Sequence, residues 1–280
     1  MKVSQTIGVF DSGVGGLSVL RAIRALLPEV GVIYLGDQAH VPYGPRPLEE
    51  VRAFSEAVTR FLLAQGASLI VVACNTASAA ALHSLREQFP LVPFVGMEPA
   101  VKPAAEQTHS GVVGVLATPA TFQGALYASV VERFAQGVIV LQDTCPGLVT
   151  QIEQGNLAGA ETRTILERAL HPMLARGIDT VVMGCTHYPF VIPLIEDIVR
   201  SYPGEPVVRV IDPAPAVARQ TARLLDLDPD RGRPPETAAG RLRVLTTGAQ
   251  QDLQKLLPLL LNETVPVQQV SWSQTGLRLA

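Results

Sequence analysis

Two of the three cysteines stand in matching contexts that favour chemistry over packing. Cys74 follows the apolar run 69–73 and is followed by Asn-Thr. Cys185 follows the run 181–184 and is followed by Thr-His. A thiol at the junction of a strand and a helix lies near free backbone N–H groups and the positive end of the helix dipole, both of which stabilise a thiolate. Either cysteine alone could equally be a small buried apolar residue, but the matched pair favours a catalytic role.

The third cysteine lacks this context. Cys145 stands in Asp-Thr-Cys-Pro-Gly and is expected to be structural. Three cysteines at wide spacing, without a Cys-x-x-Cys pair, indicate neither a disulfide framework nor a zinc site. The same spacing disfavours a thiol redox protein. The pattern predicts free thiols in a reducing, cytoplasmic compartment, and we expect no metal site.

A glycine-rich turn follows the first apolar run, residues 6–10. Asp11 and Ser12 precede three glycines in the sequence Asp-Ser-Gly-Val-Gly-Gly. Such a turn lets the backbone approach an anionic group closely. It lacks the Lys and Ser/Thr of a P-loop and does not match G-x-G-x-x-G, which disfavours a nucleotide site. Asp11 either caps the following helix or, at the mouth of a strand, orients a base or an ammonium group.

A second polar segment, residues 37–46, is expected to form a loop after the second strand. Its sequence is Asp-Gln-Ala-His-Val-Pro-Tyr-Gly-Pro-Arg, with the Pro and Gly typical of turns. It is either an ordinary turn or a wall over a bound substrate, since binding residues often lie on loops held by a rigid scaffold.

Short apolar runs and amphipathic stretches alternate along the chain and must position these residues. The apolar runs predict buried strands at 6–10, 32–35, 68–73, 92–95, 112–117, 138–141, 180–183, 207–211, 243–246 and 267–271. Helical spacing predicts helices at 15–27, 48–65, 76–88, 119–134, 157–175, 190–200 and 249–260. The Pro- and Gly-rich segment 226–240 is expected to be an exposed connection. This alternation predicts an α/β fold with mainly parallel sheets.

The chain also carries a weak internal repeat. VVACNTASAA (71–80) resembles VVMGCTHYPF (181–190), and VFDSGVGGLS (9–18) resembles VLATPATFQG (115–124) in form. Two similar α/β domains, each with one cysteine at the end of a strand, account for the repeat. Because ligands bind beyond the carboxyl ends of parallel strands, we expect the active site in the crevice between the domains.

Composition excludes several classes of protein. The chain has 280 residues, 48% hydrophobic and 17% charged, which is enough for a sizeable core in one large domain or two modest ones. A net charge of −3 provides no general basic field for nucleic acid. The uncharged stretch between Arg60 and Arg86 is interrupted by polar residues and does not predict a membrane span. No long apolar run precedes Asp11, so no signal peptide is expected.

Five segments, in order over roughly residues 7–212, together resemble the glutamate racemase family: DSGVGGLSVL (11–20), YLGDQAHVPYG (34–44), VVACNTASA (71–79), GVLATPAT (114–121) and GCTHYP (184–189). Relatives that act on aspartate generally lack the D-S-G-x-G-G start and the V-P-Y-G loop. The chain departs from the family pattern at Pro213, where Ser is expected, and at Met97, where Ile is frequent. Neither position is assigned to the chemistry.

The resemblance implies a racemase that interconverts L-glutamate and D-glutamate without pyridoxal phosphate, metal or any other cofactor, and supplies D-glutamate for peptidoglycan. It implies a first domain of residues 1–98 plus 212–280 and a second domain of residues 99–211. Only three lysines are present, which is compatible with the absence of a Schiff base. The expected partners are glutamate and a second copy of the chain in a homodimer, with no nucleic acid and no membrane.

The resemblance also assigns residues to the reaction. Cys74 is expected to deprotonate D-glutamate and Cys185 to deprotonate L-glutamate, from opposite faces of Cα. Asp11 is expected to assist Cys74, His187 to assist Cys185, and Glu153 to be a third assisting acid. The expected substrate contacts are Asp11, Ser12, Pro42, Tyr43, Gly44, Asn75, Thr76, Thr118, Thr121, Thr186 and His187.

Two alternatives remain open beside a glutamate racemase. A superfamily member acting on another small acid would share the fold, although a one-cysteine decarboxylase is disfavoured because exchange with inversion needs a base on each face. A non-enzymatic two-domain binding protein would need the crevice but not the thiols.

Overall fold

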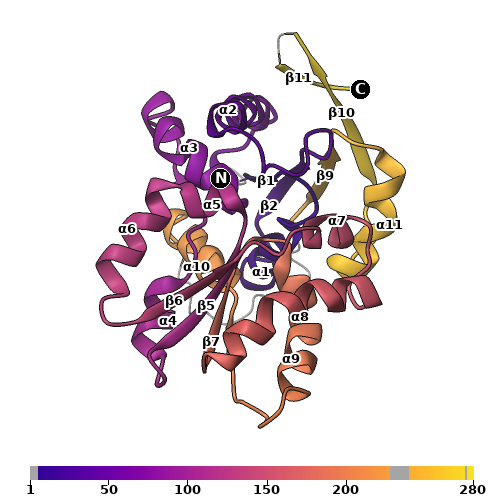
Figure 1. Cartoon of the computed structure of the whole chain (residues 1–280). Coiled ribbons are helices and arrows are strands. Elements are labelled where there is room, and N and C mark those ends of the chain that lie inside the picture. Colours follow the sequence, from indigo (N-terminus) through magenta and orange to yellow (C-terminus); the bar gives the residue numbers. More distant parts are fainter. Residues whose placement is uncertain (1–5, 228–239, 275) are drawn as a thin grey trace.

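The first of two sheets contains the first and the last strand of the chain (Figure 1). The computed structural model describes residues 6–227, 240–274 and 276–280, so most of the predicted connection 226–240 lies outside the described residues. The sheet has the strand order β11-β10-β9-β2-β1-β3-β4, and only the β10–β11 pair is antiparallel. Its strands are β1 (Thr6–Asp11), β2 (Gly31–Gly36), β3 (Leu69–Val72), β4 (Phe94–Val95), β9 (Leu242–Thr246), β10 (Val267–Ser273) and β11 (Gly276–Leu279).

The second sheet repeats the topology of the first. Its order is β6-β5-β7-β8, all parallel, which matches β2-β1-β3-β4 strand for strand. Its strands are β5 (Val112–Ala117), β6 (Ile139–Asp143), β7 (Thr180–Gly184) and β8 (Arg209–Ile211). The prediction of two similar α/β domains with mainly parallel sheets is confirmed, and the cysteine-bearing strands β3 and β7 occupy equivalent places.

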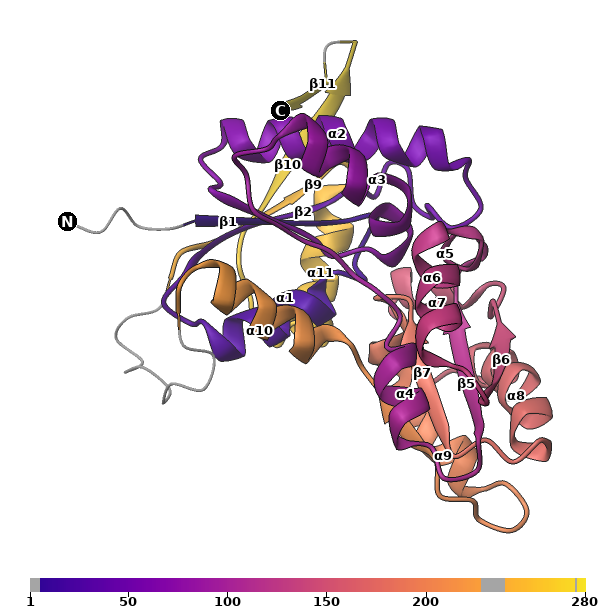
Figure 2. The same cartoon turned by 90° about the vertical axis from the view of Figure 1, so that its left-hand side faces the viewer.

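Helices cover both faces of the first sheet (Figure 2). One face packs against α2 (Leu48–Ala64) and α3 (Asn75–Gln88), and the other against α1 (Leu17–Leu26), α10 (Ala214–Leu224) and α11 (Gln250–Leu260). Alternate residues of each strand therefore enter different cores: Ile33 packs with the α2 side and Val32 with the α1 side. This two-sided burial explains why the strands are continuous apolar runs.

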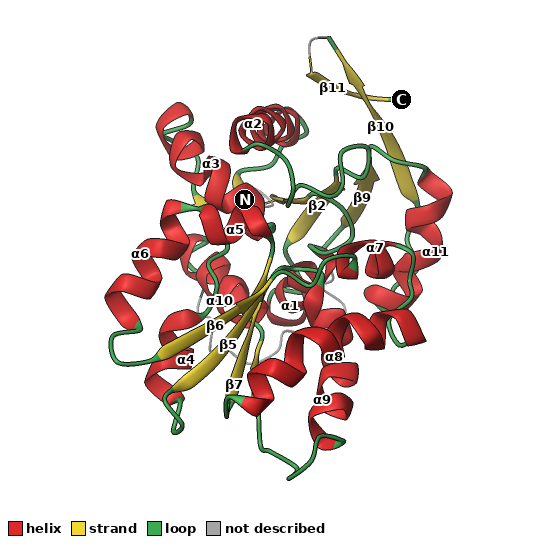
Figure 3. Cartoon of the chain, in the orientation of Figure 1, coloured by secondary structure: helices red, strands yellow, loops and turns green. Residues whose placement is uncertain are grey.

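The second sheet is covered in the same way (Figure 3). The helices α4 (Val101–Gln107) and α6 (Ala125–Phe134) bury Val113 and Val115 on one face, whereas α8 (Ala160–Ala175) and α9 (Ile192–Arg200) cover the opposite face. Three short elements complete the domain near its strand ends: α5 (Pro119–Gln123), α7 (Leu148–Glu153) and the 3-10 turn η1 (Tyr188–Val191).

The structure differs from the sequence prediction in several elements. The helix expected at 119–134 is two helices, because Gly124 adopts extended backbone angles between α5 and α6. The helices α4, α7 and α10 and the edge strand β11 were not predicted. The first two are six or seven residues long, too short for apolar periodicity to identify them. No helix among the described residues is long and apolar enough to cross a membrane.

Candidate active site

The carboxyl ends of corresponding strands meet where the two domains face each other. Asp11 ends β1, and Cys74 follows β3 in the first domain. Thr118 follows β5, and Cys185 follows β7 in the second domain. Both cysteines line one cavity, whose other lining residues are Ser12, Pro42, Tyr43, Gly44, Asn75, Thr76, Thr118, Val149, Thr186 and His187.

Three predicted site residues lie behind this lining and are hydrogen-bonded to it. Asp11 contacts Thr186, Glu153 contacts His187, and Thr121 contacts Thr118. Val149, on α7, is the lining residue that sequence reasoning missed, because it belongs to no recognisable motif. Cys145 is buried but does not line the cavity, as its context indicated.

The two thiols face a small cavity. Its volume is about 20 Å³, which is room for about one water molecule. Both catalytic candidates, Cys74 and Cys185, are only 5% exposed. In this conformation the cavity is smaller than an amino-acid ligand.

Cys74 is held as the N-cap of α3. Its Sγ accepts a hydrogen bond from the Ala77 N–H at 3.4 Å. Burial raises the pKa of the Cys74 thiol far above its ordinary value, and the negative charge of Asp11 raises it further, while the N–H groups of Ala77 and Ser12 oppose the shift only in part. Cys74 is therefore a protonated thiol here, and a cation bound beside it would favour the thiolate.

Cys185 begins a chain of three interacting side chains. Its Sγ lies 3.7 Å from His187 Nδ1, and His187 Nε2 lies 2.6 Å from Glu153 Oε1. Burial works to lower the pKa of His187, but the hydrogen bonds and charges of Cys185 and Glu153 raise it well above its ordinary value. Burial works to raise the pKa of Glu153, but His187 and the Val14 N–H lower it. The raised pKa favours the protonated imidazole of His187, which lies between Cys185 and Glu153.

The glycine-rich turn lets the second domain approach the first. A Cβ on Gly13 would lie 1.9 Å from Glu153 Oε1, and a Cβ on Gly15 would lie 2.4 Å from His187 Nδ1. Between them, the Val14 N–H donates a hydrogen bond to Glu153 Oε1 at 2.7 Å. The turn does approach an anionic group, and that group is a carboxylate of the chain itself.

Asp11 is fully buried, and its two oxygens are occupied. One accepts the Gly13 N–H at 2.8 Å and the other the Thr186 hydroxyl at 2.9 Å. The helix α1 begins at Leu17 with Gly16 as its N-cap and no side-chain cap, so Asp11 does not cap it. Burial raises the pKa of Asp11, although His187 and the two hydrogen bonds oppose that shift.

The buried Asn75 amide points to a polar ligand. Its Oδ1 and Nδ2 are both buried, and neither finds a hydrogen-bond partner in the described part of the chain. An unsatisfied buried amide is costly, and such groups in native proteins are commonly paired with water or a ligand. Nearby, the hydroxyls of Thr76, Thr118 and Thr121 form a chain at 2.8 and 2.9 Å across the domain interface.

Within residues 6–227, 240–274 and 276–280, no group of three or more His, Cys, Asp or Glu side chains is arranged to hold a metal ion. The groups at the site that can move protons are the two thiols, two carboxyls and one imidazole described above.

Comparison with known proteins places this geometry in a family. The model of the Asp/Glu/hydantoin racemases matches residues 7–221. The chain belongs to this family. A glutamate racemase from Pseudomonas aeruginosa is 50% identical to this racemase over 257 residues, covering 92% of this chain and 94% of the relative.

Solved structures agree in fold over nearly the whole chain. The Escherichia coli glutamate racemase, in complex with L-glutamate and the activator UDP-MurNAc-ala, has a TM-score of 0.80 at 34% identity and covers 95% of this chain and 98% of that one. The Francisella tularensis glutamate racemase, in complex with D-glutamate, has a TM-score of 0.78 at 27% identity and covers 96% and 98%. The expected resemblance and the racemase class are confirmed.

Proposed function

We propose that this racemase interconverts L-glutamate and D-glutamate, with Cys74 and Cys185 as bases on opposite faces of Cα. The observation that carries the proposal is that the two thiols, from equivalent strand ends of two similar domains, line one cavity. Racemisation removes a proton from one face of Cα and returns one to the other, which two single-proton bases accomplish. The glutamate racemases named above support glutamate as the substrate.

The unequal environments of the two thiols set up the first step. Cys185, whose Sγ lies 3.7 Å from His187 Nδ1, takes the α-proton of L-glutamate. Cys74, held as a thiol, donates its proton to the opposite face and becomes the thiolate, which yields D-glutamate. In the reverse reaction the Cys74 thiolate takes the α-proton of D-glutamate, and the Cys185 thiol returns its proton to the opposite face of Cα. Asp11, whose charge acts on Cys74, assists that thiol. The α-ammonium of glutamate favours the Cys74 thiolate by its charge.

Fixed donors at the cavity suit the two carboxylates of glutamate. We place the α-carboxylate at the N-terminus of α3, against Asn75 and Thr76, where helix N–H groups face a developing negative charge. This placement gives the unpartnered Asn75 amide its hydrogen bonds. We place the side-chain carboxylate against the loop of Tyr43 and Gly44 and the hydroxyl of Thr118. Ser12, Pro42, Thr121, Thr186 and His187 complete the contacts or support them.

The remaining features of the function follow from the same resemblance. We propose that no cofactor takes part, because two thiols suffice for the proton exchange, and that the product serves peptidoglycan synthesis in the cytoplasm, where the three free cysteines stay reduced. We also propose domains of residues 1–98 plus 212–280 and 99–211, which the strand membership of the two sheets supports. The homodimer and the absence of nucleic-acid partners stay predictions.

The test is the loss of the circular dichroism of L-glutamate on the purified enzyme. The enzyme is first dialysed against a chelator and treated with an amine that traps pyridoxal, and L-aspartate serves as the control substrate. We expect glutamate to racemise and aspartate to remain unchanged. Activity that returns only with added metal or pyridoxal phosphate, or aspartate that racemises as fast, would contradict the proposal.

A further inference from the structure

A buried carboxylate holds the loop that covers the cavity. Asp37, fully buried, begins the loop that leads to Tyr43 and Gly44. Its Oδ2 accepts a hydrogen bond from the Tyr43 hydroxyl at 2.6 Å and lies 2.9 Å from His40 Nδ1. Tyr43, only 1% exposed, lines the cavity beside Cys74. The position of Asp37 therefore determines where this wall of the cavity stands.

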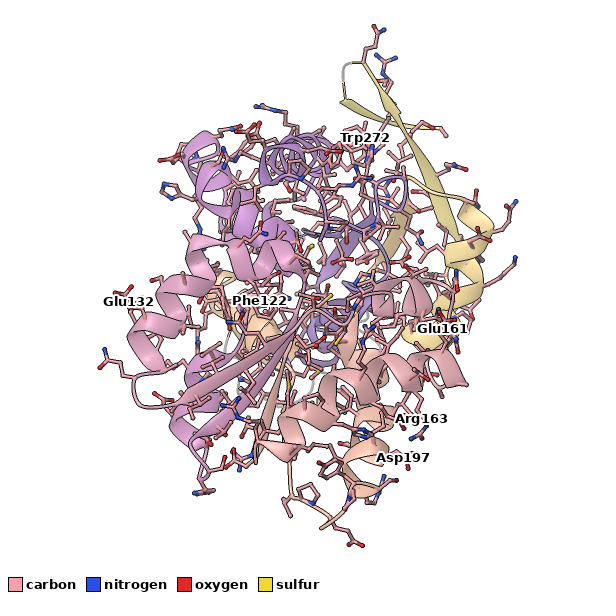
Figure 4. The ribbon with its side chains drawn as sticks, viewed as in Figure 1. Phe122, Glu132, Glu161, Arg163, Asp197 and Trp272 are labelled. Carbon is pink, nitrogen blue, oxygen red and sulfur yellow. The ribbon has the colours of Figure 1, made fainter. Side chains whose placement is uncertain are left out.

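The other oxygen of Asp37 is held from the far end of the chain. Oδ1 accepts hydrogen bonds from the Thr247 hydroxyl at 2.7 Å and from the Trp272 indole N–H at 2.8 Å. Thr247 follows β9, and Trp272 lies on β10 beside α2 (Figure 4). The Trp272 ring also meets the edge of the His40 ring, with centroids 4.9 Å apart. Both donors lie outside residues 7–221, the part that the family model matches.

The loop in turn contacts the second domain. The Ala120 N–H of α5 donates a hydrogen bond to the Gly44 carbonyl at 3.2 Å. A Cβ on Gly44 would lie 2.9 Å from Thr118 Cβ, so the loop and the hydroxyl chain are in close contact. A displacement of Tyr43 and Gly44 would therefore change both the cavity wall and its fit to the second domain.

We propose that Thr247 and Trp272 are positioning residues of the active site. They hold the Asp37 carboxylate, which holds Tyr43, so that the loop meets the side-chain carboxylate of the substrate in one geometry. Four side-chain groups contact the two oxygens of Asp37. The loss of one donor leaves a buried oxygen short of a hydrogen bond, which favours a shift of the Asp37 side chain toward other partners. The inference rests on the proposed function only in naming glutamate as the substrate. The contacts that hold Asp37 and Tyr43 do not depend on that function.

Kinetics of paired variants test this role. Trp272→Phe keeps a ring but removes the N–H, and Thr247→Val removes the hydroxyl. Each is expected to raise KM for glutamate about tenfold and to change kcat less than about threefold, because the loop binds substrate and transition state alike. Thr247→Ser, which keeps the hydroxyl, and Ser271→Ala, at an exposed site next to Trp272, are expected to match the wild type.

Alkylation of the thiols by iodoacetamide supplies a second measurement that does not depend on activity. Both Trp272→Phe and Thr247→Val are expected to speed modification of Cys74 at least about threefold, measured by mass spectrometry, with Cys145 unchanged. Cys145 is buried away from the cavity and reports general loosening. The inference would be overturned if modification of Cys145 rose in step with that of Cys74. It would also be overturned if the variants kept the wild-type KM and the wild-type rate of Cys74 modification. If the wild type fails to racemise glutamate while Cys74 still responds, the proposed function fails and the positioning role stands.

Discussion

The Thr186 hydroxyl donates a hydrogen bond to the Asp11 carboxylate at 2.9 Å, across the interface between the two domains. Thr186 directly follows Cys185 in the second domain. Asp11, in the first domain, raises the pKa of Cys74 by its negative charge. Through this hydrogen bond, the carboxyl that raises the pKa of Cys74 contacts the residue that directly follows Cys185.

Separate removal of the thiols tests the two bases. Either Cys74→Ser or Cys185→Ser is expected to lower kcat for racemisation more than about a hundredfold, because an alcohol is a far weaker acid and a poor base here. Each variant is nevertheless expected to bind glutamate, since Asn75, Thr76 and Thr186 remain.

A β-chloro analogue of glutamate separates the two faces, because it eliminates HCl after a single deprotonation. Cys74→Ser is expected to process the L-analogue through Cys185, and Cys185→Ser the D-analogue through Cys74. Elimination of both enantiomers equally well by one variant would mean that one base serves both faces. Reversed preferences would leave the mechanism intact and exchange the assigned faces.

The third cysteine is expected to be dispensable for the chemistry. Cys145→Ala should retain kcat/KM within about tenfold, which is a barrier change of ~1.4 kcal/mol, because Cys145 does not line the cavity. The measurement is the rate of racemisation in both directions, beside Cys74→Ala. A loss of activity as severe as that of Cys74→Ala would show that Cys145 takes part in the chemistry.

The Glu153–His187 pair makes the free energy of unfolding depend on pH. The raised pKa of His187 gives stability that is fully present below its unfolded value, about pH 6.5, and is lost as the pH rises through the folded value. The lowered pKa of Glu153 gives stability that is present above its unfolded value, about pH 4.3, and is lost as the pH falls through the folded value. The pair therefore stabilises the fold most between those two limits.

Urea denaturation of wild type and His187→Asn across pH 3 to pH 10 measures this contribution. The difference in unfolding free energy between the two proteins is expected to be largest near about pH 5.5 and to shrink toward alkaline pH. Glu153→Gln is expected to give a difference that shrinks instead toward acid pH. A difference that stays constant with pH in both variants would contradict the ion pair.

A substitution in the glycine-rich turn tests whether close contact between the two domains is needed for activity. Gly13→Ala places a Cβ against Glu153 and is expected to lower kcat/KM more than about tenfold, because the second domain can no longer reach the turn. In a double-mutant cycle, adding Gly13→Ala to Glu153→Ala should cost much less than Gly13→Ala alone. Additive losses would mean that the turn acts independently of Glu153.

Local pattern in the sequence determined the α/β alternation, the two similar halves and the strand-end position of Cys74 and Cys185. These features depend on apolar runs and on residues adjacent in the chain, which a sequence displays directly. Resemblance to the family pointed to Glu153 as a site residue. It did not predict the hydrogen bond that Glu153 accepts from the glycine-rich turn. The short helix α7, which presents Glu153, lacks the length that reveals a periodicity.

Tertiary structure alone decided which groups meet and what charge they hold. The Trp272 indole reaches Asp37 across 235 positions of sequence, and no local signal relates them. Likewise, the pKa of Glu153 is lowered by His187 and by the Val14 N–H of the other domain, which outweigh the effect of burial. Cys74 and Cys185 have similar local contexts, yet one lies near a carboxylate and the other near an imidazolium. That difference depends on the pairing of β1 with β3, which brings Asp11 to Cys74, and on the packing of Glu153 against His187, because electrostatic energy depends on distance in space.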